Sequence, residues 1–331
     1  MKIRIVSPFP EGFPSGSNVT AYRWARLLAS LGHEVAVTDL DHDYAGDILV
    51  ALGAVPCAPL VLSSYRQAPR RPVIVALTGT DLALLPRHTA AQSAIDLASR
   101  VIVFQPAALD SVARTVRQHS EVIYQAAQPL KSAQLPRRDV FVVTLAASLR
   151  VEKNPLLAAR AARRLPLSSQ IRIEHFGAVV DESLAEEVRT EMAGNGRYHW
   201  AGAIPHPSLR KRLAASHGLI VPSTVEGGAN VISEAAVDGV PILASRIPGN
   251  VGILGDQYPG YFTSSDPDSL AELLRLLETS PDFSRRLRAA LEPAARNFRP
   301  SEEKKRWRRL LAAMAAKIEK PSALAKGLST S

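Results

Sequence analysis

Apolar and polar positions along the chain follow two alternating periods. Short, nearly continuous apolar runs predict strands that are covered on both faces, as in a parallel sheet. Between them, apolar residues recur every three or four positions, which predicts helices. In the first part of the chain, strand-like runs lie at 2–6, 34–40, 48–52, 72–77, 101–104 and 121–124, with an amphipathic helix at 19–32. This alternation predicts an α/β domain.

The alternation stops at residues 129–138, where two prolines and little apolar material predict a linker. It restarts with strand-like runs at 140–147, 171–177, 197–202, 218–223 and 240–245, and helical segments near 155–165, 181–193, 206–216, 230–239, 267–279 and 283–296. We therefore predict two doubly wound, Rossmann-like domains, residues 1–130 and 138–298, facing across a cleft. Ligands of such sheets bind at the carboxyl ends of the strands.

The end of the chain has a different character. Apolar residues at helical spacing, Trp307, Leu310, Leu311, Met314 and Ile318, are surrounded by basic ones. Residues 281–331 contain 13 lysines and arginines against 5 acids, which accounts for most of the net charge of +9. We predict a helix at 299–320 that docks its apolar stripe on the body of the protein, followed by a flexible tail at 321–331. Nucleic-acid binding is disfavoured because aromatic residues other than Trp307 do not interleave with the basic ones.

Bulk properties agree with a cytoplasmic protein of two domains. A chain of 331 residues is longer than one typical core requires. Its single cysteine, Cys57, allows no internal disulfide and fits a reducing compartment. The N-terminus starts on a strand-like run without the apolar region of a signal peptide, and no segment is apolar for the length of a membrane span. We expect no integral membrane contact.

The stretch TVEGGANVISEA (224–235) follows a predicted strand and carries two acids around a glycine pair. Gly227 and Gly228 would let the backbone approach a ligand, and the helix behind them, with Asn230 as its predicted N-cap, would offer N–H groups to a phosphate. Glu234 could accept hydrogen bonds from a ribose diol. In continuous helix, Glu226 and Glu234 would lie about 12 Å apart, too far for a hydrolytic carboxylate pair. The structural alternative is a capped turn.

Three other loops follow predicted strands. Arg150 and Lys153, in the loop 146–155, suit a diphosphate, although surface cations are common. The loop 7–21 has glycines but no G-x-G-x-x-G, which disfavours a nicotinamide dehydrogenase. The loop 77–82 brings two threonines, a glycine and Asp81 together, with a helix-capping role as the alternative for the acid. The eight histidines show no metal-ligand spacing, so no metal is expected.

The E-x7-E pattern at 226–234, with Arg150 and Lys153 upstream, resembles the retaining glycosyltransferases of the B-type fold, in the family-4-like group. This resemblance implies that the second domain holds most of a sugar nucleotide. The Arg/Lys pair would meet the diphosphate, Glu234 the ribose, and the Glu226 region the donor sugar. It also implies that the last helix crosses back to the first domain.

Longer stretches resemble the selenosugar synthases of selenoneine biosynthesis, from about residue 1 to 263. They include ALTGTDL (76–82), SLRVEKNPLLAA (148–159), YHWAGAIPH (198–206) and EGGANVISEAAVDGVPILAS (226–245). The resemblance implies that a UDP-sugar, such as UDP-N-acetylglucosamine, meets selenophosphate. A carbon–selenium bond forms at the anomeric carbon, UDP leaves, and loss of phosphate gives a 1-seleno-sugar.

From these observations we expect Glu226, Arg150 and Lys153 to be catalytic and no metal or other cofactor to be needed. The predicted donor-binding residues are Glu226, Gly227, Gly228, Ala229, Asn230, Glu234, Arg150 and Lys153. The predicted acceptor-binding residues are Gly16, Ser17, Asn18, Arg23, Thr78, Gly79, Thr80 and Asp81. The alternatives are a hexosyltransferase acting on a hydroxyl of a lipid or small molecule, and a non-catalytic sugar-nucleotide binder. The oligomeric state and the sugar stay open.

Overall fold

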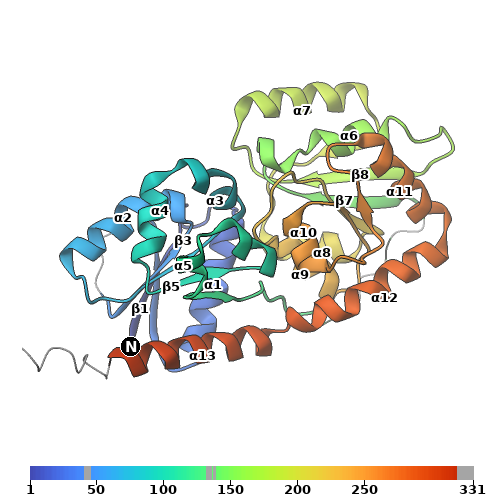
Figure 1. The fold of residues 1–331 in the computed structure, drawn as a ribbon. Helices are drawn as coiled ribbons and strands as arrows, with labels where there is room; N and C mark the ends of the chain where they lie inside the picture. Colours follow the sequence, from blue (N-terminus) through green and yellow to red (C-terminus); the bar gives the residue numbers. More distant parts are fainter. Residues whose placement is uncertain (41–45, 132–135, 137–138, 319–331) are drawn as a thin grey trace, which may run out of the picture.

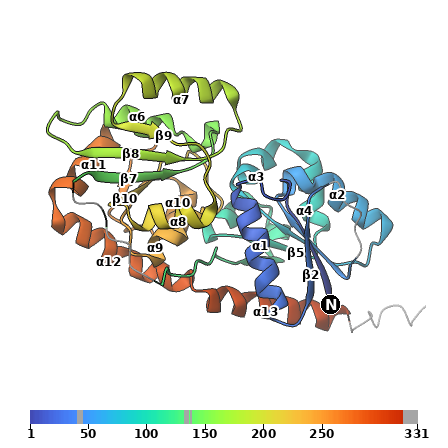
Figure 2. The ribbon, with the colours of Figure 1, turned by 180° about the vertical axis from the view of Figure 1, so that it is seen from behind.

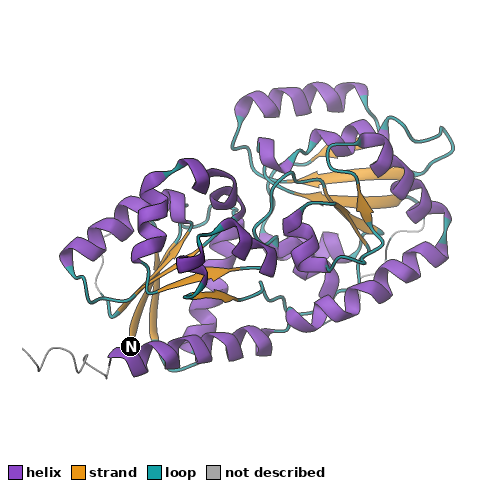
Figure 3. Ribbon diagram, viewed as in Figure 1, coloured by secondary structure: helices purple, strands orange, loops and turns teal. Residues whose placement is uncertain are grey.

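The computed structural model contains two α/β domains side by side and a long C-terminal helix that runs from the second domain back beneath the first (Figure 1). The structure describes residues 1–40, 46–131, 136 and 139–318. Each domain is built on one six-stranded sheet, and every strand pair in both sheets is parallel. The fold therefore confirms the predicted class of two Rossmann-like domains (Figure 3).

The first sheet has the strand order β2-β1-β3-β4-β5-β6. Its strands are β1 (Lys2–Val6), β2 (Glu34–Thr38), β3 (Ile48–Leu52), β4 (Val73–Ala76), β5 (Arg100–Val103) and β6 (Ser120–Val122). The helical segments are α1 (Gly16–Ala29), α2 (Ala54–Gln67), α3 (Gly79–Leu84), η1 (Leu85–Arg87), α4 (Thr89–Leu97), η2 (Pro106–Ser111) and α5 (Arg114–Arg117). Side chains alternate between the faces of a strand. Leu49 and Ala51 accordingly pack towards α2 and α4, whereas Ile48 and Val50 pack towards α1.

The second sheet has the order β12-β11-β10-β7-β8-β9. Its strands are β7 (Phe141–Ala146), β8 (Ile171–Phe176), β9 (Tyr198–Trp200), β10 (Gly218–Val221), β11 (Ile242–Ser245) and β12 (Tyr261–Phe262). Its helical segments are η3 (Val151–Lys153), α6 (Leu156–Ala162), α7 (Glu182–Gly194), α8 (His206–Ala214), α9 (Asn230–Val237), α10 (Pro248–Leu254), α11 (Pro267–Thr279) and α12 (Pro281–Asn297). The strand order reverses between β7 and β10, which places a switch point at their carboxyl ends.

The last helix, α13 (Pro300–Ile318), lies under the first domain (Figure 2). Trp307 packs edge-on against Trp24 of α1, with ring centroids 4.8 Å apart. Leu310, Leu311 and Met314 are buried in the same core. The side chain of Ile318, the tail predicted at 321–331 and most of the linker predicted at 129–138 lie outside the described residues.

Several elements differ from the sequence pattern, and two of them, both in the first domain, show why. The helix predicted at 19–32 begins at Gly16, because Ser15 caps it by accepting the N–H of Asn18. Helix α2 was missed, since prolines normally mark the end of a helix. Its first proline stands in the first turn, where no N–H donor is needed, and Pro59 is accommodated inside the helix.

Candidate active site

A cleft of about 1250 Å³ separates the two domains at the carboxyl ends of both sheets. The loops after β1, β3 and β4 line it from the first domain, and the loops after β7 and β10 with the start of α9 line it from the second. Of the residues predicted to bind a donor or an acceptor, all but Gly227 and Asp81 line this cleft. The switch points of two parallel sheets thus bring loops that are distant in sequence to one space.

Glu226 lies in the loop after β10 and is held by two donors. Lys153 Nζ is 2.5 Å from Glu226 Oε1, and Ser223 Oγ donates to the same oxygen at 2.7 Å. Glu226 is only 5% exposed. The lysine comes from the loop after β7, so the strands on either side of the switch point supply the two partners. Because Glu226 takes one of the three N–H groups of the ammonium, Lys153 keeps donors for an anion.

Further hydrogen bonds behind the cleft wall hold Ser223, the residue that donates to Glu226. The backbone carbonyl of Ser223 accepts a hydrogen bond from Ser245 Oγ at 2.5 Å. Asn250 Nδ2 donates to Ser245 O and Oγ at 2.9 and 3.1 Å. Ser223, Ser245 and Asn250 are almost completely buried. Because buried polar groups with partners are rigid, this network fixes the orientation of the Ser223 hydroxyl towards Glu226.

Arg150 reaches across the cleft to the first domain. Its Nη1 donates to Thr80 Oγ1 at 3.2 Å and to Glu152 Oε1 at 3.4 Å. Its guanidinium also lies 5.8 Å from the ring of Phe9, on the loop after β1. Arg150 is therefore placed where the loops of both domains meet, with several of its five N–H donors unused by these contacts.

Glu234 and His206 form a second pair in the cleft. His206 Nε2 lies 2.7 Å from Glu234 Oε1, and Glu234 is 5% exposed. We did not single out His206 from the sequence, because isolated histidines are usually structural. Its position was a usable signal, since it starts a helix after the carboxyl end of β9, on the same sheet edge as the predicted residues.

The glycine pair Gly227–Gly228 has neighbours that the sequence did not indicate. A Cβ on Gly227 would lie 2.6 Å from the backbone nitrogen of Gly79, and one on Gly228 would lie 2.2 Å from Phe104 Cβ. Gly79 and Phe104 belong to the first domain. The small size of these glycines therefore allows the two domains to approach, whereas we had assigned it to the approach of a ligand.

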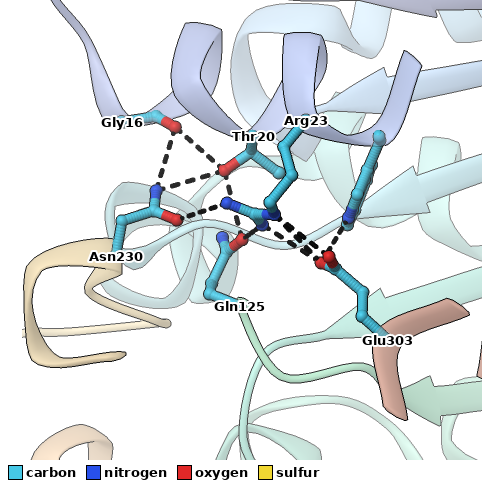
Figure 4. Close-up of polar contacts among 7 residues, drawn as sticks. Gly16, Thr20, Arg23, Gln125, Asn230 and Glu303 are labelled. Carbon is cyan, nitrogen blue, oxygen red and sulfur yellow. Dashed lines mark hydrogen bonds and ion pairs between the residues drawn. The ribbon is translucent and has the colours of Figure 1, made fainter. Parts of the chain in front are cut away.

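Asn230 was predicted to cap α9, and this prediction is wrong. The N-cap is Ala229, and the Asn230 side chain turns away to α1. Its Nδ2 donates to Gly16 O at 3.1 Å and to Thr20 Oγ1 at 3.2 Å. Arg23 Nη1 donates to its Oδ1 at 2.8 Å (Figure 4). A side chain that satisfies α1 of the other domain cannot at the same time bond the N–H groups of its own helix.

Arg23 connects three parts of the molecule in Figure 4. Besides Asn230, it bonds Gln125, which follows β6, and the carboxylate of Glu303 on α13. Glu303 Oε1 also accepts from Trp24 Nε1 at 2.8 Å. These protein partners use four of the five N–H donors of the guanidinium, which leaves Arg23 little capacity for a direct contact with an acceptor.

Two predicted acceptor residues have structural partners. Asn18 accepts from Ser7 Oγ at 2.6 Å and donates to the carbonyls of Pro10 and Phe13, which holds the loop after β1. Asp81 accepts from Val55 N and from the N–H and hydroxyl of Thr78. Asp81 is fully buried and caps α3, the alternative that the sequence had left open. Burial raises the pKa of Asp81, against the effect of its donors. It does not face the cleft as a base.

Two features are absent from the described part of the chain. Within these residues, no three histidine, cysteine, aspartate or glutamate side chains lie together as a possible metal site. Across the same ranges, none of the helices combines the length and the apolar character that crossing a bilayer requires.

Comparison with known proteins points to one family. The family "Glycosyl transferases group 1" matches residues 128–298. "Glycosyltransferase 1 domain-containing protein 1" of Xenopus tropicalis is 30% identical over 144 residues, which are 43% of this chain and 41% of that protein. The UDP-Gal:alpha-D-GlcNAc-diphosphoundecaprenol alpha-1,3-galactosyltransferase of Escherichia coli is 30% identical over 146 residues, 42% of this chain and 36% of that one. The chain thus matches about two fifths of the length of these curated relatives.

Solved structures share the fold over nearly the whole chain. Anabaena Alr3699/HepE in complex with UDP and glucose has a TM-score of 0.77 at 17% identity, covering 95% of this chain and 100% of that one. Sucrose-phosphate synthase from Thermosynechococcus elongatus has a TM-score of 0.77 at 15% identity, covering 96% and 99%. The family match covers more than half of the chain, including the domain that carries Lys153, Glu226 and Glu234. The chain therefore belongs to the group 1 glycosyl transferases.

Proposed function

We propose that this chain transfers a hexosyl group, N-acetylglucosamine or a related sugar, from a UDP-sugar to selenophosphate. One observation supports the use of a sugar nucleotide as donor. Four charged side chains line the cleft near the switch point of the second sheet: Arg150, Glu234 and the bonded pair Lys153–Glu226. These are two cations for a diphosphate and two carboxylates for sugar and ribose hydroxyls. Family membership supports the use of a sugar nucleotide by this site.

The donor would lie along the start of α9. The first N–H groups of this helix have no carbonyl partner one turn earlier, and the helix dipole adds partial positive charge there. A diphosphate placed at this end would also be within the reach of Arg150 and Lys153, which lie on the neighbouring loop after β7. As UDP departs, its leaving oxygen gains negative charge, which these groups stabilise.

In the transfer, the selenium of selenophosphate attacks the anomeric carbon. The bond from that carbon to the UDP oxygen breaks, and UDP takes the electron pair. Water then cleaves the phosphorus–selenium bond, which releases phosphate and leaves selenium on the sugar. The first step needs no base, because the acceptor is already anionic. This agrees with Asp81 lying buried behind the cleft wall rather than facing it.

The first-domain side of the cleft supports an anionic acceptor. Helix α1 begins at Gly16, and the N–H groups of Gly16 and Ser17 start that helix without a partner inside it. The hydroxyl of Thr80 lies on the same wall. Replacing Thr80 by Val should therefore raise the KM for selenophosphate more than the KM for the UDP-sugar.

A hydroxyl acceptor is the second candidate, and one observation favours it. Phe9 and Phe13 are stacked with ring centroids 5.0 Å apart, and both line the cleft. Such a face would suit the apolar part of a lipid or small molecule. For a lipid acceptor, we expect the protein to float with anionic vesicles, whereas selenophosphate transfer predicts no co-flotation.

The decisive experiment incubates the protein with UDP-N-acetylglucosamine and selenophosphate. We expect UDP release together with a sugar mass that carries the isotope pattern of selenium. Lys153→Met should abolish both signals while the far-ultraviolet circular dichroism spectrum is retained. If UDP were released only in the presence of hydroxyl acceptors, the acceptor would be a hydroxyl compound and not selenophosphate. UDP binding without release in the presence of any acceptor would instead indicate a non-catalytic binder.

A further inference from the structure

Glu234 is a buried carboxylate in the cleft wall, and its hydrogen-bonding partner comes from another helix. It lies in α9, and His206, the first residue of α8, donates its ring N–H to Glu234 Oε1 at 2.7 Å. The side chain of Glu234 is 7% exposed, whereas that of His206 is 41% exposed. Both residues line the cleft. The acid is therefore buried, whereas its partner is partly exposed to solvent.

The backbone on either side of His206 holds the ring in place. Pro205 is the N-cap of α8, and Pro207 occupies its first turn. Proline fixes its own φ angle, so the two prolines that flank His206 limit the movement of the backbone on either side of it. Restricting the backbone limits the positions available to the imidazole, and the hydrogen bond then selects the one that faces Glu234.

The second carboxylate oxygen is differently placed. No hydrogen bond from the described residues reaches Glu234 Oε2, and it is not among the buried atoms left without a partner. It is therefore accessible from the cleft. One oxygen of the carboxylate is held by the protein, and the other is open to a ligand hydroxyl.

We propose that His206 is a positioning residue that aims Glu234 at the ribose diol of a nucleoside diphosphate. This inference rests on the proposed function, in which Glu234 contacts the ribose. Without His206, the carboxylate would lose the one donor that it has among the described residues and could turn away from the diol. A carboxylate that is fixed before binding forms its ligand hydrogen bonds without losing side-chain freedom.

The test measures the affinity for UDP and for 2′,3′-dideoxy-UDP by calorimetry, with the full chain and three variants. For His206→Ala we expect UDP to bind about 5- to 15-fold more weakly, as when one hydrogen bond of ordinary strength is lost. The dideoxy compound should bind His206→Ala and the unaltered chain equally, because it has no diol to recognise. His206→Gln retains a donor at similar reach and should restore most of the UDP affinity.

His199→Ala is the matched control. His199 is an exposed histidine on β9 of the same domain and does not line the cleft, so its removal should leave both affinities unchanged. In turnover assays, His206→Ala should raise the KM for the UDP-sugar with little change in kcat, as expected when ground state and transition state lose the same contact.

The possible outcomes distinguish a failure of this inference from a failure of the proposed function. Equal weakening of UDP and dideoxy-UDP in His206→Ala would indicate a packing role and overturn the inference alone, as would unchanged UDP binding. Failure of the unaltered chain to bind UDP at all would overturn the proposed function, and the inference with it.

Discussion

The guanidinium of Arg23 and the carboxylate of Glu303 form an ion pair between the first and the last helix of the protein. The distances from Arg23 Nε to the two carboxylate oxygens are 3.1 and 3.3 Å. The side chain of Glu303 is 1% exposed and that of Arg23 17%. Through Arg23, the crossover helix α13 is connected to Asn230 at the start of α9 in the second domain. One buried pair thus lies where three segments meet.

Replacing Glu303 by Ala should lower the free energy of unfolding by about 3 kcal/mol, because it leaves the guanidinium of Arg23 and the indole N–H of Trp24 without their acceptor. Urea denaturation measures the loss. Glu34→Ala, at an exposed pair with Lys2, is the control and should change the stability by about 0.5 kcal/mol or less. Equal losses in the two variants would contradict a special role for the buried pair.

Gly227→Ala should lower kcat/KM by roughly tenfold to a hundredfold, because the new methyl group pushes the backbone at Gly79 away and misplaces the first domain. UDP affinity should fall less than turnover, since the proposed donor site lies mainly on the second domain. Gly196→Ala is the matched control, because its methyl group would meet open space. Turnover is measured by steady-state kinetics and UDP affinity by calorimetry on both variants. Unchanged turnover in Gly227→Ala would show that the close contact between Gly227 and Gly79 is not needed for catalysis.

Ser223→Ala should reduce kcat by about tenfold, because Glu226 loses a hydrogen bond that orients it, while Lys153 alone remains. Steady-state kinetics with the UDP-sugar provide the measurement. The exposed Ser183, which bonds Asp181 at the start of α7, is the corresponding control, and its alanine variant should be fully active. A Ser223→Ala enzyme with normal kcat would show that Lys153 is sufficient to place the carboxylate.

His175 should make the protein less stable in mild acid. Its Nε2 donates to the Ala147 carbonyl, which can only accept, so its Nδ1 accepts from the Tyr198 hydroxyl. Burial lowers the pKa of His175 from 6.5 to about 4. The unfolded chain therefore binds more protons between these values, and the free energy of unfolding falls as the pH drops from 6.5 to 4.

The loss attributable to His175 is about 3 kcal/mol across this window. Urea denaturation at pH 7 and pH 4.5 measures it. His175→Gln, which does not titrate, should show a clearly smaller difference between the two pH values than the unaltered chain. If both proteins lost the same stability, other groups would be responsible for the acid sensitivity.

The periodic pattern was sufficient to predict most strands of the two sheets and most helices of the second domain, because burial on one or both faces imposes a period on the sequence. The strand β3 is an example, since ILVAL is buried at every position and reads as a continuous apolar run. Helix α2 was not predicted from the periodic pattern. Its prolines resemble a helix boundary, and only the surrounding core shows that the segment remains helical around Pro59.

The loops of the site were also predictable, because parallel strands all end at the same edge of a sheet. Arg150, Lys153 and Glu226 could be placed in one cleft for this reason alone, and they line it. The same rule would have included His206, which follows β9 on that edge. It was missed because a single histidine has no spacing pattern of its own.

What a polar or small side chain does in this cleft was decided by tertiary structure. Asn230 looked like a helix cap, but its partner is α1, more than 200 residues earlier in the chain. Gly227 looked like a ligand contact, but it meets Gly79. The sequence by itself determined the two domains and the edge on which the chemistry lies, since these follow from local periodicity and chain direction. Only the tertiary packing, within and between the domains, determined which side chains are already occupied, because partners such as those of Asn230 are adjacent in space and distant in sequence.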